Sequence, residues 1–191
     1  MSDKDKPSIL LLAAPDTSAS VLYGLYDVLF SVGAVYPDMA TGVPGQELLD
    51  VRVVSAEGTP FHCIGNIPVE PHGALDAVET ADAVVVCDMY LSIYEAPRGR
   101  HPREVAWLKR MHAGGALLTS VCSGALLLAE TGLLNGHTAT AHWAYRDTFQ
   151  RHYPQVAFSN NAILCLEGEA DRLVTAAGVS AWQDLAITAS R

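Results

Sequence analysis

The chain has 191 residues, of which half are hydrophobic and 17% are charged. This length and composition suit one domain with its own core and exclude an intrinsically disordered chain. The formal net charge is −9. Because an acidic surface repels phosphate, we expect no direct contact of this chain with nucleic acid.

Short apolar runs alternate with amphipathic stretches along the chain, which is typical of a parallel sheet covered by helices. The first half predicts strands at 8–14, 51–56 and 83–87, a helix at 20–32, a loop at 36–46, and irregular strands or a hairpin at 59–72. The second half predicts helices at 102–112, 123–131, 143–152 and 179–191, and strands at 116–121, 138–141, 162–166 and 173–176. We therefore expect a single α/β domain, doubly wound, with a mostly parallel sheet and helices on both faces.

The four cysteines and the apolar runs bear on where the protein resides. The cysteines include no Cys-x-x-Cys pair, which favours free thiols in a reducing compartment. The segment 1–16 lacks the pattern of a signal peptide, and no apolar stretch approaches the roughly 20 residues that cross a bilayer. We expect a cytoplasmic protein that does not bind a membrane.

One predicted strand runs directly into a helix through Cys122. The apolar segment 116–121 precedes this cysteine, and Ser123-Gly124 follows it at the start of the helix. This is the arrangement of a nucleophile elbow, in which the small residues Gly124 and Ser120 relieve crowding on either side of the turn. The turn places the sulfur at the carboxyl end of the sheet, where open α/β sheets bind ligands.

The expected surroundings of the Cys122 sulfur favour a thiolate. The free N–H groups and the positive end of the following helix lower the pKa of a cysteine at this position, and the same groups can hold an oxyanion. The alternative is that Cys122 is an inert, small apolar residue in a buried strand. Spacing alone leaves both interpretations open.

The segment 120–143, SVCSGALLLAETGLLNGHTATAHW, resembles the ThiJ/PfpI superfamily, the class I glutamine-amidotransferase-like domains. It is most similar to isonitrile hydratase and to the N-terminal domains of GlxA-type AraC-family transcriptional regulators. Segments 24–29 and 175–186 are similar to the same groups. The resemblance implies a flavodoxin-like fold for one domain over 1–191 and a homodimer. For the regulators it also implies a small-molecule ligand and a helix-turn-helix domain after Arg191.

Two positions depart from the enzymes that this chain resembles. Their first helix carries an acid that approaches the cysteine, and Val21 occupies the matching position here. An apolar side chain cannot act as a general acid or base. A Pro-Gly-Gly-like turn follows their third strand, whereas this chain reads VCDMY at 86–90. Side chains there narrow the pocket, and the charge of Asp88 opposes an oxyanion.

Seven residues form the candidate site. Cys122 is the reactive or vestigial nucleophile, and we expect a ligand to contact Asp16, Cys87, Asp88, Ser123, Gly124 and His142. His142 either contacts the pocket or is a hydrogen-bonded structural histidine, and a role as catalytic base is the weaker alternative. Histidines and acids do not combine at metal-ligand spacing and no phosphate-binding glycine loop occurs, so we expect no metal and no cofactor. The basic run 97–103 is interpreted as a solvated loop or an anion contact.

Two functions from different classes follow. The first is a ligand-sensing, dimerising domain of an AraC-family regulator, non-catalytic or weakly catalytic, with a small-molecule ligand of unknown identity. The alternative is a cysteine-dependent hydratase or hydrolase resembling isonitrile hydratase, with Asp16 or Asp88 as a displaced acid. A third option is a stand-alone structural or redox-responsive protein with an oxidisable Cys122. The residues at 21 and 86–90 favour the first.

Overall fold

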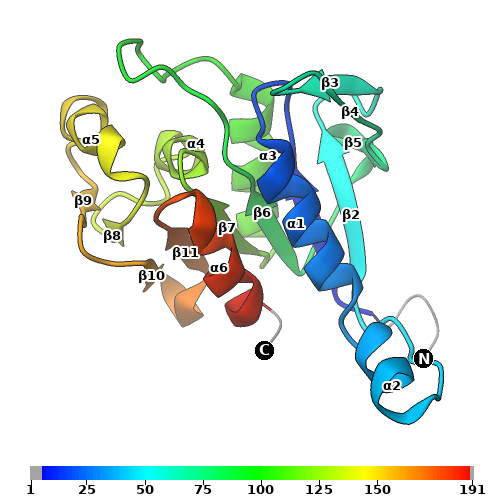
Figure 1. Ribbon diagram of the computed structural model, residues 1–191. Helices are drawn as coiled ribbons and strands as arrows, with labels where there is room; N and C mark the ends of the chain where they lie inside the picture. The colour runs from blue at the N-terminus through cyan, green and yellow to red at the C-terminus, as the bar shows by residue number, and fades with distance from the viewer. Residues whose placement is uncertain (1–5, 190–191) are drawn as a thin grey trace.

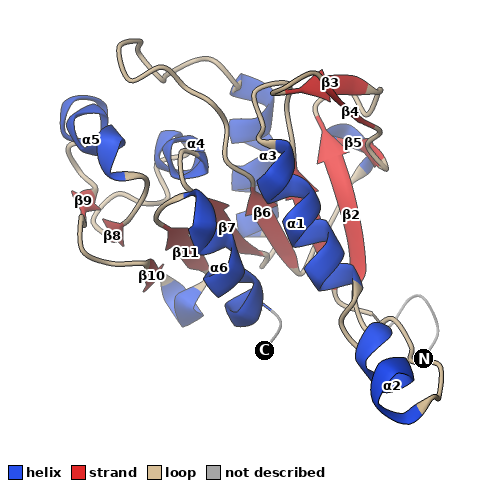
Figure 2. Cartoon of the chain, viewed as in Figure 1, coloured by secondary structure: helices blue, strands red, loops and turns tan. Residues whose placement is uncertain are grey.

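The computed structural model describes residues 6–189 and places a seven-stranded sheet at the centre of the molecule (Figures 1 and 2). All neighbouring strands pair in parallel except β10 with β11. In spatial order the strands are β10 (Leu164–Glu167), β11 (Leu173–Ala176), β7 (Leu117–Val121), β6 (Ala83–Val86), β1 (Ser8–Leu12), β2 (Asp50–Ser55) and β5 (Gly73–Ala74).

Helices cover both faces of this sheet. Figure 1 shows α1 (Ala19–Phe30) and α6 (Trp182–Ala189) in front of it. The opposite face carries α3 (Pro102–Ala113), α4 (Gly124–Glu130) and α5 (Arg146–His152). The predicted doubly wound α/β fold with a mostly parallel sheet is therefore confirmed.

The central strand β1 explains why its sequence is apolar throughout. Ile9 and Leu11 enter the cluster beneath α1 and α6, while Leu10 and Leu12 enter the cluster beneath α3, α4 and α5. Successive side chains of a strand point to opposite faces, so a strand covered on both sides must be apolar at every position.

The segment predicted as the loop 36–46 is partly helical, which corrects that expectation. The short helix α2 (Val35–Thr41) contains Pro37 in its first turn, where a missing backbone donor is tolerated. It ends at Gly42, whose φ of 68° is the left-handed conformation that a glycine adopts without strain. None of the residues of α2 is buried, and Figure 1 shows it projecting from the lower end of the sheet.

Two further pairs of short strands lie outside the main sheet. The predicted hairpin is confirmed, because β3 (Phe61–Cys63) pairs antiparallel with β4 (Ile67–Val69). The pair β8 (Thr138–Ala139) and β9 (Ala157–Phe158) is parallel, and β9 was not predicted because two residues carry no periodic signal. Short one-turn helices lie at Leu75–Ala77, Trp143–Tyr145 and Val179–Ala181, and Glu169–Asp171 is a turn in which Ala170 has a left-handed φ of 54°.

Within residues 6–189 no single helix is long and apolar enough to cross a bilayer. The bent pair α1 and α2 passes the same test only when its two helices are taken together.

The strand order predicts a crevice at the carboxyl ends of the central strands. The chain winds outward from β1 through β2 on one side and through β6 and β7 on the other. At such a switch point the loops after adjacent strands diverge and leave room for a ligand at the carboxyl ends. A long loop, 87–101, leaves β6 there and reaches α3; it is the green loop at the top of Figure 1.

Candidate functional site

Cys122 lies in a tight turn between β7 and α4. Its φ is 54°, a left-handed conformation that is uncommon for a residue with a side chain. Its backbone N–H donates to the carbonyl of Ala176 on β11 at 2.9 Å, so the sheet holds the residue in this conformation. Backbone strain that is fixed by its surroundings is typical of functional sites. The predicted passage from strand to helix through Cys122 is confirmed as a backbone geometry.

Gly124 permits this turn because the neighbouring strand passes immediately beside it. A Cβ at Gly124 would lie 2.6 Å from the carbonyl oxygen of Val86 and 2.7 Å from that of Cys87. Real Cβ atoms do not approach backbone oxygens so closely. The predicted role of Gly124 in relieving crowding agrees with this geometry, and Gly124 is not among the residues that line the pocket.

Ser123 connects the loop that follows β6 to the turn at Cys122. Its Oγ accepts a hydrogen bond from the N–H of Met89 at 2.9 Å and donates one to the carbonyl of the same residue. Met89 also forms a β-bridge with Thr17, which precedes α1. The loops after β1, β6 and β7 are therefore tied together around Cys122.

A pocket of about 470 Å³ lies beside Cys122, where the loops after the central strands meet. Its volume is in the range of small-molecule sites. Four of the seven residues of the predicted site line it, namely Asp88, Cys122, Ser123 and His142. The other lining residues are Ser18, Ile64, Tyr90, Leu91, Ser92, Ile93, Tyr94, Ala144, Tyr145 and Val179.

The structure corrects the expectation for Cys87. Its side chain is 0% exposed and belongs to the core beneath α1 and α6. Burial raises the pKa of this thiol, and the nearby carboxylate of Asp88 raises it further. Cys87 and Asp88 are consecutive at the end of a strand, so their side chains leave in opposite directions and only Asp88 faces the pocket.

Asp16 does not line the pocket either, because it pairs with His101. The two side chains approach to 3.5 Å, and Glu104 lies 3.7 Å from the other ring nitrogen. The nearby carboxylate of Asp16, followed by that of Glu104, raises the pKa of His101 to about 9, so the ring is cationic at neutral pH. The backbone carbonyl of Asp16 accepts from the N–H of Tyr90 at 2.7 Å and so supports the rim of the pocket.

Asp88 is a buried carboxyl group without a full set of partners. The residue is 7% exposed, and its Oδ1 has no hydrogen-bond partner among the described residues. Burial raises the pKa of Asp88 to about 6, although backbone hydrogen bonds from Ser18 and from Asp88 itself favour the charged form. At neutral pH the wall of the pocket therefore holds an anionic carboxylate, of which Oδ1 is buried and lacks a partner among the described residues.

Of the two interpretations left open for Cys122, the burial of its side chain favours a thiol that is not activated. Burial raises its pKa to about 11, and the charge of Asp88 adds to this effect. Backbone N–H groups of Ser123 and His142 and the hydroxyl of Ser123 favour the thiolate, but they do not outweigh burial. The residue is 6% exposed, and α4 has only seven residues. At neutral pH Cys122 is a neutral thiol.

Val21, at the position matching the acid of the enzymes in the resemblance, is fully buried in the core. Asp88 reaches the same pocket from a different element, the loop after β6. The pocket thus contains one cysteine and one carboxyl group, but the carboxyl group does not come from the first helix.

His142 combines both roles that the sequence left open. Its ring lines the pocket, and its Nδ1 accepts from the N–H of Ala144 at 3.3 Å, which caps the following helical turn. Because Nδ1 acts as an acceptor in this cap, the proton of the neutral ring lies on Nε2.

The aromatic wall of the pocket was missed at the sequence level. Tyr145 is buried, donates its hydroxyl hydrogen to the carbonyl of Leu91 at 2.7 Å, and lies edge-on to the His142 ring. Tyr90 and Tyr94 stand at the rim and are 71% and 92% exposed. The sequence pattern that could have indicated this wall is the three-residue spacing from His142 to Tyr145, which puts both on one side of a helical turn.

Comparisons with known proteins agree with this architecture. The family model DJ-1/PfpI matches residues 9–190. The HTH-type transcriptional regulator CdhR of Pseudomonas aeruginosa is 30% identical over 155 residues, which are 81% of this chain and 44% of that protein. Isonitrile hydratase of Pseudomonas putida is 29% identical over 136 residues, 71% of this chain and 52% of the enzyme. The chain thus spans less than half the length of the regulator that it matches.

A solved structure shows the same fold. The AraC family transcriptional regulator from Pseudomonas putida superposes with a TM-score of 0.75 at 17% identity, covering 97% of this chain and 91% of that one. The match of the family model over residues 9–190 places the chain in the DJ-1/PfpI family.

Proposed function

We propose that this chain is the ligand-sensing, dimerising N-terminal domain of an AraC-family transcriptional regulator, cytoplasmic and without strong catalytic activity. The observation that carries this proposal is the chemistry at Cys122. Its pKa of about 11 leaves a neutral thiol in a ligand-sized pocket, where an enzyme needs an activated nucleophile. The similarity to a transcriptional regulator supports the same function.

The walls of the pocket favour a small organic cation. Asp88 places an anionic carboxylate with a buried, unpartnered Oδ1 in the wall, and such a charge is costly to bury unless a positive or hydrogen-donating group lies near it. Tyr90, Tyr94 and Tyr145 line the same pocket, and the faces of aromatic rings attract cations. A cation that touches both sets of groups would be held by charge and by apolar contact.

We further propose that the domain pairs with a second copy and leaves DNA contact to another domain. Large apolar side chains at Val28, Phe30, Val35, Tyr36 and Met39 are exposed on α1 and α2. Soluble proteins seldom leave such a group of side chains uncovered, so this surface supports the proposed pairing.

The ligand proposal is tested with choline and its uncharged carbon analogue as the first pair of probes. We expect choline to raise the melting temperature and the analogue to have a much smaller effect, because only the cation meets Asp88. Binding should weaken as the pH falls through about 6, where Asp88 becomes protonated. Equal effects of the two probes, or binding unchanged in Asp88→Asn, would contradict the proposal.

The alternative function is that of a cysteine-dependent hydratase. It is favoured by the 29% identity to isonitrile hydratase and by the carboxyl group of Asp88, whose pKa of about 6 suits an acid–base group. Turnover of an isonitrile by the purified chain, lost in Cys122→Ser, would establish it. We expect no turnover, because the thiol is not ionised.

A further inference from the structure

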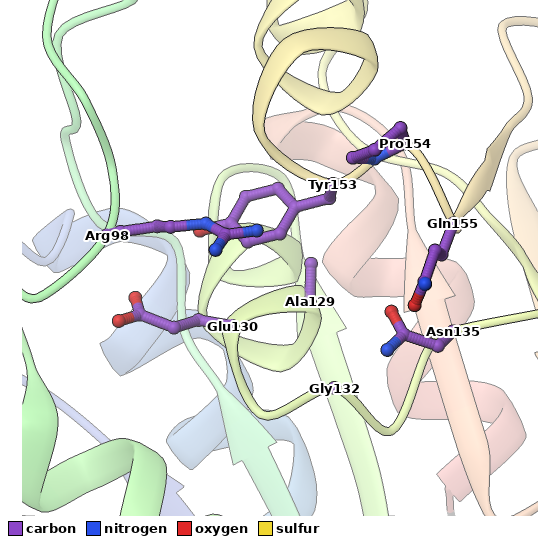
Figure 3. Close-up of a pocket in the computed structure, with 8 residues that line it drawn as sticks. All are labelled: Arg98, Ala129, Glu130, Gly132, Asn135, Tyr153, Pro154 and Gln155. Carbon is purple, nitrogen blue, oxygen red and sulfur yellow. The ribbon is translucent and has the colours of Figure 1, made fainter.

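A second cavity lies away from Cys122, on the side of the molecule where α4 ends (Figure 3). Its volume is about 490 Å³, similar to that of the Cys122 pocket, and the two share no lining residue. Its polar walls are formed by Arg98, Glu130, Asn135, Tyr153 and Gln155. The proposed function does not use this site. Arg98 belongs to the basic run 97–103, and Ala129, Glu130, Gly132 and Asn135 belong to the segment 120–143.

The two charged groups of this cavity are each held in place by the backbone. Arg98 donates from Nη2 to the carbonyl of His152, and its guanidinium lies over the ring of Tyr153 at 5.2 Å. Glu130 accepts the N–H of Gly99 at 2.7 Å through Oε1. A guanidinium has five N–H donors and a carboxylate has two acceptor oxygens, so both groups keep capacity for a ligand.

The opposite wall carries two amide side chains. Figure 3 shows Asn135 and Gln155 close to each other, across the cavity from Arg98 and Glu130, with Ala129 between the two pairs. The backbone holds this wall, because the N–H of Gly136 donates to the carbonyl of Gln155 at 2.8 Å. Both amides are exposed, and each offers donors and an acceptor.

A buried hydroxyl group in the wall lacks a partner. Tyr153 is 4% exposed, and its hydroxyl oxygen makes no hydrogen bond within residues 6–189. Burial, and then the charge of Glu130, raise the pKa of Tyr153, so this group is a neutral donor and acceptor. An unpaired buried hydroxyl destabilises the folded protein, and a ligand hydroxyl that reaches it would remove that cost.

We propose that this cavity is a binding site for a small, neutral, polyhydroxylated molecule of the sugar class. The charges of Arg98 and Glu130 sum to zero, so the walls favour neither an anion nor a cation. Each hydroxyl of such a ligand both donates and accepts, which matches a wall of mixed donors and acceptors. A phosphate or a nucleic acid would meet the carboxylate of Glu130, and an apolar ligand would leave the fixed polar groups unpaired.

Isothermal titration calorimetry of the full chain with glucose, trehalose and myo-inositol tests this site. Sugars also stabilise proteins by exclusion from their surface, so saturable heat is a better readout than a melting temperature. We expect saturable binding of at least one of these probes and none of glucose 6-phosphate. Asn135→Ala and Gln155→Ala should each weaken it about tenfold, because each removes ligand hydrogen bonds from an exposed side chain.

Two matched variants distinguish binding in this cavity from binding at the exposed surface and in the Cys122 pocket. Asn160→Ala removes an exposed amide outside the cavity and should bind like the wild type. Asp88→Asn changes only the Cys122 pocket and should also bind like the wild type, so a failure here is distinct from a failure of the proposed function. Absence of saturable heat with all three probes, or binding unchanged in both Asn135→Ala and Gln155→Ala, would overturn the proposal.

Discussion

Gly124→Ala is expected to destabilise the protein by about 3 kcal/mol, because the added methyl group collides with backbone that cannot move independently. The Cβ would lie 2.6 Å and 2.7 Å from the carbonyl oxygens of Val86 and Cys87. These oxygens lie at the end of β6, which pairs with β7 and β1 in the centre of the sheet. The helix α4 must therefore shift, and Cys122 must shift with it.

Denaturant unfolding of Gly124→Ala beside Gly178→Ala measures this effect. At Gly178 an added Cβ meets no atom within 4 Å, and the φ of −82° suits any residue. We expect this control to change the unfolding free energy by less than about 0.5 kcal/mol. Equal stability of the two variants would show that α4 and β6 are not as close as the structure has them.

Asp88→Asn is expected to stabilise the ligand-free protein by about 2 kcal/mol at pH 7, because it removes a buried, incompletely partnered charge. Folding raises the pKa of Asp88 from 3.8 to about 6. A group whose pKa is raised on folding contributes stability that is fully present below its unfolded pKa and is lost as the pH rises through the folded pKa. The advantage of the asparagine should therefore appear between pH 4 and pH 7.

Unfolding curves at several pH values, with Asp27→Asn as the control, test this prediction. Asp27 is exposed on α1, so its replacement should have little effect at any pH. The Asp88→Asn variant should gain stability but lose ligand binding, since the same carboxylate is proposed to hold the cationic ligand. If Asp88→Asn were less stable than the wild type at pH 7, the carboxylate would have a partner in the folded protein.

The backbone of the site could be predicted from the sequence, but the direction of its side chains could not. The apolar runs predicted six of the seven strands of the main sheet but not the two-residue strand β5, and the predicted strand at 138–141 lies outside that sheet. Gly124 and Ser120 on either side of Cys122 predicted the tight turn. Cys87 and Asp88 were both expected in the pocket. Strand alternation permits only one of them to face it, and which one depends on the twist and pairing of β6.

The other differences between the sequence predictions and the structure have separate physical causes. Asp16 was assigned to the site, but it pairs with His101, far along the chain, and no local pattern indicates that contact. The start of a helix favoured a thiolate at Cys122 without deciding the question, because the pKa of Cys122 depends on how deeply the fold buries it. The loop at 36–46 was expected from its prolines and glycines, yet Pro37 lies in the one helical turn that tolerates it.

The most direct test of a sensing site over a catalytic one is the pH dependence of Cys122 alkylation. The wild type and Cys122→Ser are treated with iodoacetamide across the alkaline range, and the difference gives the reaction at this thiol. We predict slow labelling that still increases near pH 10, as a pKa of about 11 requires. Fast labelling with an apparent pKa below about 8.5 would show an activated nucleophile and would contradict the account.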